Sequence, residues 1–270
     1  MSQQSKGTAV VTGASTGIGA VYADRLARQG FDLVIVARNH AKLDALARQI
    51  NRDTGRNVEA VAADLADRSD LARIETLLRT DASITLLVNN AGVGATATLL
   101  EADIEKMEAL IDLNVTALTR LTYAAVRGFV ARGGGTIVNI SSIVAVAPEL
   151  MNGVYGGSKA FVLAFSQSLR HELADKGVRV QVVLPGATAT DLWALSGTPI
   201  QYLPKGIVMD TEAMVDASLA GLALGEFTTV PSLPNIADWD AYEGARRALM
   251  PNLSRETPAE RYAPMSKGSA

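Results

Sequence analysis

The feature that most constrains this chain is a regular succession of short apolar runs, each separated from the next by a longer amphipathic stretch. The runs are rich in Val, Ile and Leu, and they occupy residues 8–13, 31–38, 57–65, 84–92, 135–142 and 178–186. They are apolar throughout rather than strictly alternating, which is typical of strands buried on both faces of a parallel sheet. Parallel strands need helical crossovers, and the intervening segments are long enough to supply them. The chain is therefore predicted to be an α/β protein with helices on both faces of its sheet.

Helical patterning fills the segments between these runs. It is clearest over residues 17–29, 40–52, 67–79, 103–131 and 154–175. In the last segment Val154, Phe161, Phe165 and Leu169 recur at spacings that form one apolar stripe of a helix. A further helix is expected near 211–223, and the run FTTV at 227–230 reads as an edge strand. Together these elements predict a doubly wound parallel sheet of about seven strands.

We expect residues 1–270 to form a single domain, because α/β folds of this length commonly have one large core. Residues 191–210 change character, mixing Trp, Gly, Pro and Tyr, and are interpreted as an excursion before the next helix. Residues 235–270 are richer in Pro and charge, and an irregular or loosely helical tail is expected there.

Composition excludes several classes of function. The chain has 48% hydrophobic and 20% charged residues and a net charge of −3, which disfavours a nucleic-acid-binding surface. It contains no cysteine and only two, widely separated histidines, so we expect neither a thiol nucleophile nor a metal site. No apolar run approaches the ~20 residues of a membrane helix, and the polar start does not resemble a signal peptide. The expected location is the cytoplasm, with no membrane association.

A glycine-rich turn joins the first predicted strand to the first predicted helix, in the sequence Thr12-Gly13-Ala14-Ser15-Thr16-Gly17-Ile18-Gly19. Strand, tight turn and helix N-terminus together direct backbone N–H groups at a site where a pyrophosphate can bind. We expect Gly13 to allow the turn, Gly17 to let the backbone approach a phosphate, and Gly19 to let the helix contact the sheet. This arrangement predicts a dinucleotide site.

Tyr155 and Lys159 stand four residues apart at the start of a predicted helix, so their side chains share one face. A fixed ammonium near a phenol favours the phenolate, and we expect Lys159 to lower the pKa of Tyr155 from about 10. Such a shift would suit a general acid or base acting on an oxygen. The pair alone is common in proteins and carries little weight.

The spacing of the glycine turn, TGxxxGxG, resembles that of the short-chain dehydrogenase/reductase family. The resemblance covers roughly residues 7 to 190 and continues through further motifs in the order of the family. These motifs are Asp64, Asn89-Asn90-Ala91-Gly92, Asn114, Ser142, Tyr155, Lys159 and Pro185-Gly186. It implies a Rossmann-type fold and a nicotinamide cofactor.

The resemblance also implies a catalytic set of Asn114, Ser142, Tyr155 and Lys159. In the reduction that it implies, Tyr155 supplies a proton to the carbonyl oxygen, and Ser142 steadies that oxygen. Lys159 also binds the nicotinamide ribose, and Asn114 bends its helix and positions a water in the proton relay. Ser141 is adjacent to Ser142, but consecutive residues of a strand point oppositely, so only one should face the site.

The cofactor contacts implied by the resemblance are spread over several strand ends. Asp64 is expected to bond the adenine with Leu65 behind the ring, although Asp64 could instead cap a helix. Asn90 is expected on the adenosine side. Thr188 replaces the usual apolar residue of the family's PGxVxT segment, a change that leaves its backbone contact with the carboxamide possible. The expected set is Gly13, Ser15, Thr16, Gly17, Ile18, Gly19, Arg38, Asp64, Leu65, Asn90, Tyr155, Lys159, Pro185, Gly186, Thr188 and Thr190.

The preferred cofactor is predicted to be NADP(H) rather than NAD(H). The second strand ends in Ala37-Arg38, where NAD enzymes place a carboxylate for the ribose hydroxyl. A guanidinium can instead pair with a 2′-phosphate. Arg38 could alternatively be a solvated residue at a helix start. Thr16 stands where many NADPH-using relatives carry a second basic residue, which weighs against the assignment.

Two other functions compete with an oxidoreductase. Gly156-Gly157-Ser158-Lys159-Ala160 nearly matches a hydrolase nucleophile motif, but the last glycine is missing and no strand precedes the serine. A catalytically idle dinucleotide-binding regulator is the stronger rival. The intact catalytic set favours an enzyme.

The expected substrate is a hydrophobic carbonyl compound or secondary alcohol. Residues 143–154 and 191–210 are largely apolar and are expected to line the pocket, although they could instead pack on the body or on a partner subunit. The resemblance further implies a homodimer or homotetramer built through the long helices.

Overall fold

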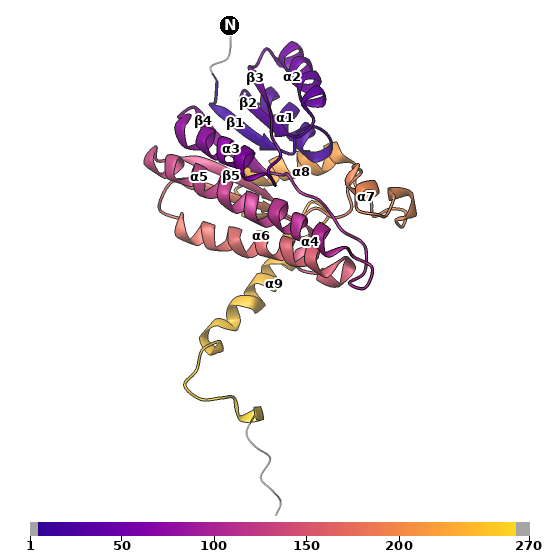
Figure 1. Ribbon diagram of the computed structural model, residues 1–270. Coiled ribbons are helices and arrows are strands. Elements are labelled where there is room, and N and C mark those ends of the chain that lie inside the picture. The colour runs from indigo at the N-terminus through magenta and orange to yellow at the C-terminus, as the bar shows by residue number, and fades with distance from the viewer. Residues whose placement is uncertain (1–4, 263–270) are drawn as a thin grey trace, which may run out of the picture. The chain divides into compact units, whose positions relative to one another are not determined.

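The computed structural model describes residues 5–262 of the chain. At its centre lies a seven-stranded sheet in which every neighbouring pair is parallel, in the order β3-β2-β1-β4-β5-β6-β7 (Figure 1). The six predicted strands and the predicted edge strand are all present. They span Thr8–Thr12 (β1), Asp32–Ala37 (β2), Val58–Ala62 (β3), Ile84–Asn89 (β4), Gly135–Ile140 (β5), Val178–Val183 (β6) and Thr228–Thr229 (β7).

Helices connect the strands and cover both faces of the sheet, which confirms the predicted α/β architecture. They span Gly17–Arg28 (α1), His40–Thr54 (α2), Arg68–Thr80 (α3), Ile104–Ile111 (α4), Leu118–Ala131 (α5), Gly153–Glu172 (α6), Leu192–Leu195 (α7), Thr211–Leu224 (α8) and Ile236–Ala248 (α9). Among residues 5–262, no helix combines the length and the apolar character needed to span a membrane.

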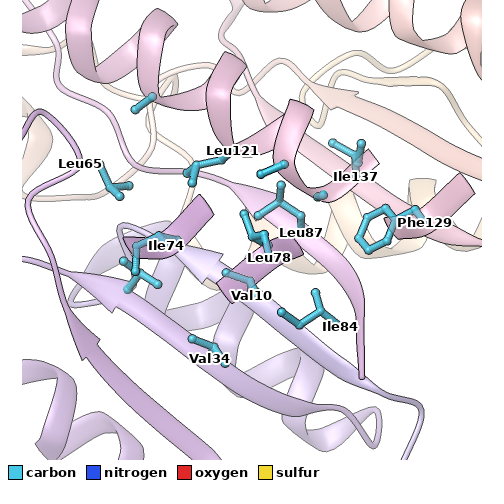
Figure 2. Close-up of a cluster of buried hydrophobic side chains, with 14 of the residues drawn as sticks. Val10, Val34, Leu65, Ile74, Leu78, Ile84, Leu87, Leu121, Phe129 and Ile137 are labelled. Carbon is cyan, nitrogen blue, oxygen red and sulfur yellow. The ribbon is translucent and has the colours of Figure 1, made fainter. Parts of the chain in front are cut away.

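Alternation along the central strands divides the core into two layers. Val10 of β1 points to one face, where it packs with Ile74 of α3 and Leu121 of α5 in the cluster of Figure 2. Its neighbours Ala9 and Val11 point to the opposite face and pack with residues of α1, α2 and α8. Both faces of each central strand are therefore buried, which explains why the runs are apolar without alternation.

The strand order places a topological switch between β1 and β4. The chain builds the sheet outward from β1 to β3, then crosses to β4 and continues in the other direction to β7. At such a point the connections after the two strands diverge, and a crevice opens at the carboxyl ends of the strands. The glycine turn follows β1 and the Asn-Asn-Ala-Gly segment follows β4, so both lie at this crevice.

The segment predicted as one helix over 103–131 is divided in the structure. A π-helical stretch, Asp112–Ala117, separates α4 from α5. π-helical turns carry one more residue per turn than an α-helix and occur frequently at functional sites. Asn114 lies inside this stretch and is buried.

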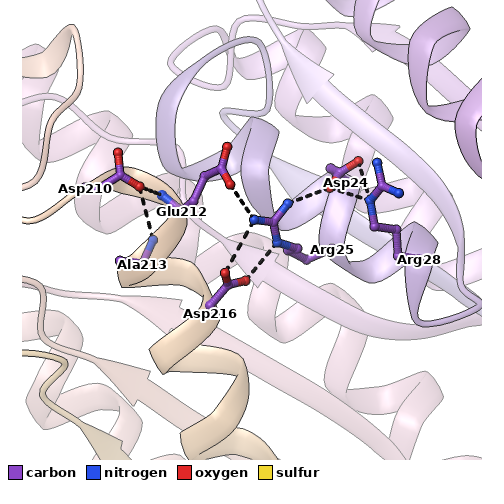
Figure 3. A network of polar contacts seen from close by, with 7 residues as sticks. All are labelled: Asp24, Arg25, Arg28, Asp210, Glu212, Ala213 and Asp216. Carbon is purple, nitrogen blue, oxygen red and sulfur yellow. Dashed lines mark hydrogen bonds and ion pairs between the residues drawn. The ribbon is translucent and has the colours of Figure 1, made fainter.

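An ion-pair network joins α1 to α8 (Figure 3). The Arg25 guanidinium of α1 contacts Asp216 at 2.8 Å and Glu212 at 2.7 Å, both on α8, and Asp24 of its own helix at 2.8 Å. Below it, the buried hydroxyls of Tyr22 and Ser218 share a hydrogen bond. The helix that follows residues 191–210 is thereby tied to the helix that follows the glycine turn.

The contacts of the chain group into two units, one up to Ser232 and a smaller one from Leu233 onward. The second unit contains α9, whose N-terminus is capped by Asn235, and short 3-10 turns at Met250–Asn252 and Glu260–Tyr262. The expected tail over 235–270 is thus more regular than the sequence indicated, with a helix of 13 residues at its start. Residues 263–270 of that tail lie outside the described residues.

Candidate active site

The glycine turn has the backbone that its sequence requires. Gly13 and Gly17 adopt φ values of +67° and +58°, which side chains rarely tolerate. A Cβ on Gly13 would lie 2.8 Å from Ala91 Cα, and one on Gly19 would lie 2.4 Å from the Gly13 carbonyl oxygen. The turn therefore packs against the segment after β4, and α1 begins directly on the turn.

Thr12 holds the turn to the end of β4. Its hydroxyl donates to Val88 O at 3.2 Å and accepts from the amides of Asn90 and Ala91, each at 3.0 Å. The Asn90 side chain donates in return to Thr12 O at 2.9 Å and Gly13 O at 3.2 Å. Asn90 thus braces the turn, while Thr12 is absent from the predicted site. A hydroxyl at the end of a buried strand, opposite an Asn-rich strand end, is the signal that could have identified it.

The N-terminus of α1 is open to an anion. Thr16 is its N-cap in an extended conformation, no side chain among residues 5–262 caps the helix, and its first turn contains no acidic residue. By contrast α2, α3, α4, α6, α8 and α9 each begin with an Asn or Asp whose side chain accepts a backbone N–H. Free amide donors at a helix start provide what a pyrophosphate needs. Ser15, Thr16 and Ile18 are half-buried around this position.

The residues expected near the adenosine lie at the ends of β2 and β3. Arg38 follows β2, is exposed, and makes no hydrogen bond or ion pair with any described residue. Asp64 accepts a bond from Ala66 N at 3.0 Å, and the N-cap of α3 is Asp67, so the alternative that Asp64 caps this helix is wrong. Leu65 is buried in the core cluster of Figure 2.

Tyr155 and Lys159 occupy the first turns of α6, and both are buried. Asn152 caps this helix by accepting from Val154 N at 2.8 Å and Tyr155 N at 3.4 Å. The Lys159 ammonium donates to Ile140 O at the end of β5, at 3.0 Å, and lies 5.9 Å from the centre of the Tyr155 ring. The predicted convergence of the pair on one helix face is therefore present.

Burial dominates the electrostatics of this pair. It raises the pKa of the Tyr155 phenol, and a hydrogen bond with Ser142 opposes this rise. Burial also lowers the pKa of the Lys159 ammonium to about 8. The expectation that Lys159 lowers the pKa of Tyr155 is wrong for this structure, because the ammonium bonds a strand carbonyl and the phenol is desolvated. A pKa raised above the usual value of a phenol leaves the Tyr155 hydroxyl protonated at neutral pH.

The two serines after β5 differ in direction, as the alternation of a strand requires. Ser141 is buried and donates to the backbone carbonyl of Lys159 at 2.7 Å, which anchors α6 to the sheet. Ser142 donates to Pro185 O at 3.4 Å, accepts from Val144 N at 3.3 Å, and lies near enough to the Tyr155 phenol to lower its pKa against the effect of burial. Of the two, Ser142 is the hydroxyl beside the phenol.

Asn114 is held rigidly at the π-helical stretch. Its side chain accepts from Val93 N and donates to Val93 O, both at 2.9 Å, and donates to Ser158 Oγ at 3.2 Å. Ser158 donates in turn to Tyr155 O at 2.8 Å. A Cβ on Gly92 would lie 2.9 Å from Asn114 Oδ1 and 3.6 Å from Lys159 Nζ. Gly92 therefore separates the Asn114 amide from the Lys159 ammonium, and neither it nor Ser158 was among the predicted site residues.

Residues 185–190 close the opposite side of the crevice. Pro185 O accepts from Ile143 N at 3.0 Å, and the Thr188 hydroxyl donates to Gly186 O at 3.2 Å. Thr188 is buried and pairs through its backbone with Met209. A Cβ on Gly17 would lie 3.1 Å from the Thr190 methyl carbon. This segment thus runs from the end of β6, beside Ser142, to the glycine turn.

The candidate site residues follow the carboxyl ends of the parallel strands and so lie along one edge of the sheet. At one end lies the uncapped helix start with the free Arg38 guanidinium, and at the other the hydroxyls and ammonium of Ser142, Tyr155 and Lys159. The residues present suit a dinucleotide, because the start of α1 offers uncapped backbone N–H groups with no acidic residue in its first turn, and Gly13, Gly17 and Gly92 let neighbouring segments pack closely around it. Among the described residues, no group of His, Asp or Glu side chains could hold a metal ion.

Comparison with known proteins gives consistent results. Residues 7–199 match the family model described as short chain dehydrogenase. A short-chain dehydrogenase from Sphingobium yanoikuyae, solved in complex with NADPH, is 47% identical with a TM-score of 0.92, over 95% of this chain and 99% of that one.

Two further proteins are similar over most of their length. A bulky-bulky ketone specific alcohol dehydrogenase from Comamonas testosteroni is 42% identical with a TM-score of 0.89, over 97% of this chain and all of that one. Human 17-beta-hydroxysteroid dehydrogenase type 3 is 33% identical over 90% of this chain and 79% of that protein.

Proposed function

This chain belongs to the short-chain dehydrogenase family, and from that premise we propose that it is an NADP(H)-dependent reductase of hydrophobic ketones, working through Tyr155. It is an oxidoreductase of the kind that acts on alcohols and ketones. The observation that carries the finer proposal is that the buried side chains of Tyr155 and Lys159 share the start of α6 beside Ser142, at the same edge of the sheet as the uncapped start of α1.

The protein's residues divide the work of the reaction. A bound nicotinamide would supply the hydride, and Lys159 with the 185–190 segment would hold its ribose and carboxamide. Tyr155 donates its proton to the carbonyl oxygen as negative charge develops there, because burial keeps the phenol protonated. Ser142 holds the Tyr155 phenol in position and also hydrogen-bonds the carbonyl oxygen of the substrate. Asn114, locked by its bonds to Val93, keeps the backbone beside Lys159 in place for proton supply. Oxidation of an alcohol reverses these steps.

A preference for NADP(H) is supported at the end of β2. The Arg38 guanidinium is exposed and unpaired among the described residues, and a guanidinium binds a phosphate through two parallel hydrogen bonds. The 47% identical relative from Sphingobium yanoikuyae was solved with NADPH.

A bulky apolar ketone is the proposed substrate class. The excursion at 191–210 presents Leu195 and Tyr202, which are 81% and 74% exposed, and Leu150 projects from the loop after β5. The relative from Comamonas testosteroni is described as specific for ketones with two bulky substituents. An apolar rim of this kind favours ketones without charge.

The proposal is tested by measuring NADPH and NADH oxidation with a panel of ketones that differ in bulk and charge. We expect turnover with bulky apolar ketones and NADPH, and little with charged ones. Arg38→Ser should raise the KM for NADPH about tenfold or more, because a charge-assisted bidentate contact is lost, and should leave the KM for NADH nearly unchanged. Equal use of both cofactors by the wild type would contradict the assignment of Arg38.

The same assay separates an enzyme from an idle dinucleotide-binding regulator. A regulator would bind NADPH, with quenching or enhancement of its fluorescence, but would oxidise it with none of the ketones. The complete set of Asn114, Ser142, Tyr155 and Lys159, all placed at one end of the crevice, supports the enzyme.

A homodimer is the proposed assembly, with α5 and α6 at the interface. Tyr123 is 62% exposed on α5, and its ring stacks on Phe165 of α6, which stacks in turn on Phe161. An aromatic surface shared by two long helices is typical of a subunit contact. Light scattering on the purified chain tests this, and a monomer at micromolar concentration would contradict it.

A further inference from the structure

The 93–97 loop, which follows β4, contacts the 191–210 excursion on one side. Thr96 donates from both its backbone N and its hydroxyl to Ser196 O, at 3.3 and 2.7 Å. Leu192 lies over Gly94, where a Cβ would be 3.0 Å from the leucine's methyl carbon. These contacts fix the position of α7. Of the two hydrogen bonds, only the one from the hydroxyl depends on the Thr96 side chain and can be removed by substitution.

The same loop contacts the start of α6 on its other side. Asn152 donates from its amide nitrogen to Ala97 O at 2.7 Å and from its backbone N to Ala95 O at 3.4 Å. Its amide oxygen meanwhile accepts from the backbone N–H of Val154 and of Tyr155. One buried side chain thus joins the loop to the backbone of the tyrosine.

Apolar packing reinforces this connection. Ala95 and Tyr155 are buried in one small cluster, together with Val144, Met107 and Leu110. A shift of the loop would therefore disturb the surroundings of the Tyr155 ring as well as its backbone. Interiors are packed densely enough to transmit such shifts.

We propose that the 93–97 loop couples the excursion to the catalytic helix, with Thr96 sensing the position of α7 and Asn152 positioning Tyr155. The inference rests on the proposed function for the role of Tyr155, but the mechanical link is independent of it. When the excursion lies against Thr96, the loop is held where Asn152 can cap α6 with the phenol in place. When it moves away, the loop and the start of α6 lose that restraint.

Asn152 is suited to this role because its amide both donates and accepts. Aspartate would keep the cap on α6, since a carboxylate accepts N–H bonds well at a helix N-terminus. Aspartate has no N–H group to donate to Ala97 O. One of its carboxylate oxygens would instead face the carbonyl oxygen of Ala97, and both atoms are acceptors. Asn152→Asp therefore removes the side-chain bond to the loop and retains the cap. Thr96→Val removes the side-chain bond to the excursion with little change of shape and leaves the longer backbone bond in place.

A double-mutant cycle tests the coupling. We expect Thr96→Val and Asn152→Asp each to lower kcat/KM for the ketone about three- to tenfold, the effect of one hydrogen bond, with the KM for NADPH unchanged. The double variant should lose about as much as the more impaired single variant, because both changes break one connection. Losses that multiply would overturn the proposal.

Thr98→Val is the matched control. Its hydroxyl bonds Glu101 at 3.0 Å on the exposed part of the connection to α4 and touches neither the excursion nor α6. It should leave kcat/KM and the KM for NADPH unchanged. A loss equal to that of Thr96→Val would show general disturbance of the loop and contradict the specific role of Thr96.

A second measurement needs no turnover. The chain has two tryptophans, and in a Trp239→Phe background Trp193, which donates to Thr188 O at 3.0 Å in the excursion, is the only reporter. We expect acrylamide quenching of Trp193 to increase in Asn152→Asp as it does in Thr96→Val. Unchanged quenching in Asn152→Asp would overturn the coupling. If the wild type reduces none of the ketones, the proposed function is wrong, but the quenching measurement still tests the coupling between the loop and the excursion. If Asn152→Asp does not fold, Asn152→Ser takes its place in both measurements.

Discussion

The buried ammonium of Lys159 is costly to the folded protein. Its side chain is buried beside the end of β5 and Gly92, and its ammonium donates to a neutral carbonyl, that of Ile140. Burial lowers its pKa from 10.5 to about 8, so its charged form is disfavoured in the fold. A residue kept at such a cost is expected to serve the reaction rather than stability.

Replacing it should therefore stabilise the protein. Below pH 8 the lysine is charged in both the folded and unfolded chains, so the penalty is fully present. Between about pH 8 and 10.5 the unfolded chain binds more protons, and the stability of the wild type rises with pH. We expect Lys159→Met to unfold with a free energy higher by roughly 1–3 kcal/mol at pH 7, an advantage that shrinks toward pH 10.5.

Urea denaturation at several pH values measures this difference. The matched control is Lys176→Met at an exposed position, which should change the free energy of unfolding far less than Lys159→Met does at pH 7. An Lys159→Met protein that is less stable than the wild type at pH 7 would contradict the assigned cost of the buried charge.

At this scale the sequence predicted which side chains lie together but not the pKa of Tyr155. The spacing of Tyr155 and Lys159 predicted a shared helix face, and the alternation of a strand separated Ser142 from Ser141 correctly in direction. The pKa of Tyr155 was predicted wrongly. Its value depends on whether the ammonium points to the phenol or to a strand carbonyl, and on desolvation by residues distant in sequence, and neither can be read from spacing.

Among the elements, α1 and α8 are joined by ion pairs that hold the two helices together. Arg25 contacts Asp216 and Glu212 on α8, and its three carboxylate partners surround one guanidinium (Figure 3). α8 begins directly after the excursion, whose last residues pair with Thr188. The network thus fixes the end of the excursion to the helix that begins at the phosphate end.

Arg25→Gln should weaken the contact between α1 and α8 and lower the free energy of unfolding. We expect a loss of about 1–2 kcal/mol, because a network of partly exposed ion pairs is worth more than an isolated one. The loss should shrink at high salt. Thermal unfolding at low and high salt measures it.

Arg28→Gln is the matched control on the same helix. Arg28 is more exposed and pairs with Asp24 alone, within α1. Its replacement should have a smaller effect than that of Arg25. Equal losses for the two variants would show that the contacts between α1 and α8 add nothing to those within α1.

Element types were predicted more reliably than interruptions within them. The segment 103–131 was expected to be helical and is so, but its π-helical stretch at Asp112–Ala117 was not identified as such. One extra residue in a turn barely alters an apolar pattern, whereas it decides where Asn114 points. An irregular or loosely helical tail was expected where the structure has the helix Ile236–Ala248. Its apolar residues form only a weak stripe among many charged residues.

For the whole molecule, the sheet and its helices followed from the sequence because burial on both faces leaves a strong apolar signal. All seven strands and their parallel pairing agree with that reading. The glycine turn alone predicted a dinucleotide site, whereas the set of Asn114, Ser142, Tyr155 and Lys159 was expected through the family resemblance. Thr12, Thr96 and Asn152 hydrogen-bond segments far away in sequence, so their partners could not be read from local patterns.

In the proposed reaction, Tyr155 donates the proton when hydride reaches the substrate. The most direct measurement is single-turnover oxidation of bound NADPH by a bulky apolar ketone, in the wild type and in Tyr155→Phe, with NADPH affinity determined by fluorescence titration. We predict an unchanged affinity and a rate lower by about 10²–10⁴-fold in the variant. A folded Tyr155→Phe protein that binds NADPH and reduces the ketone at the wild-type rate would contradict the account.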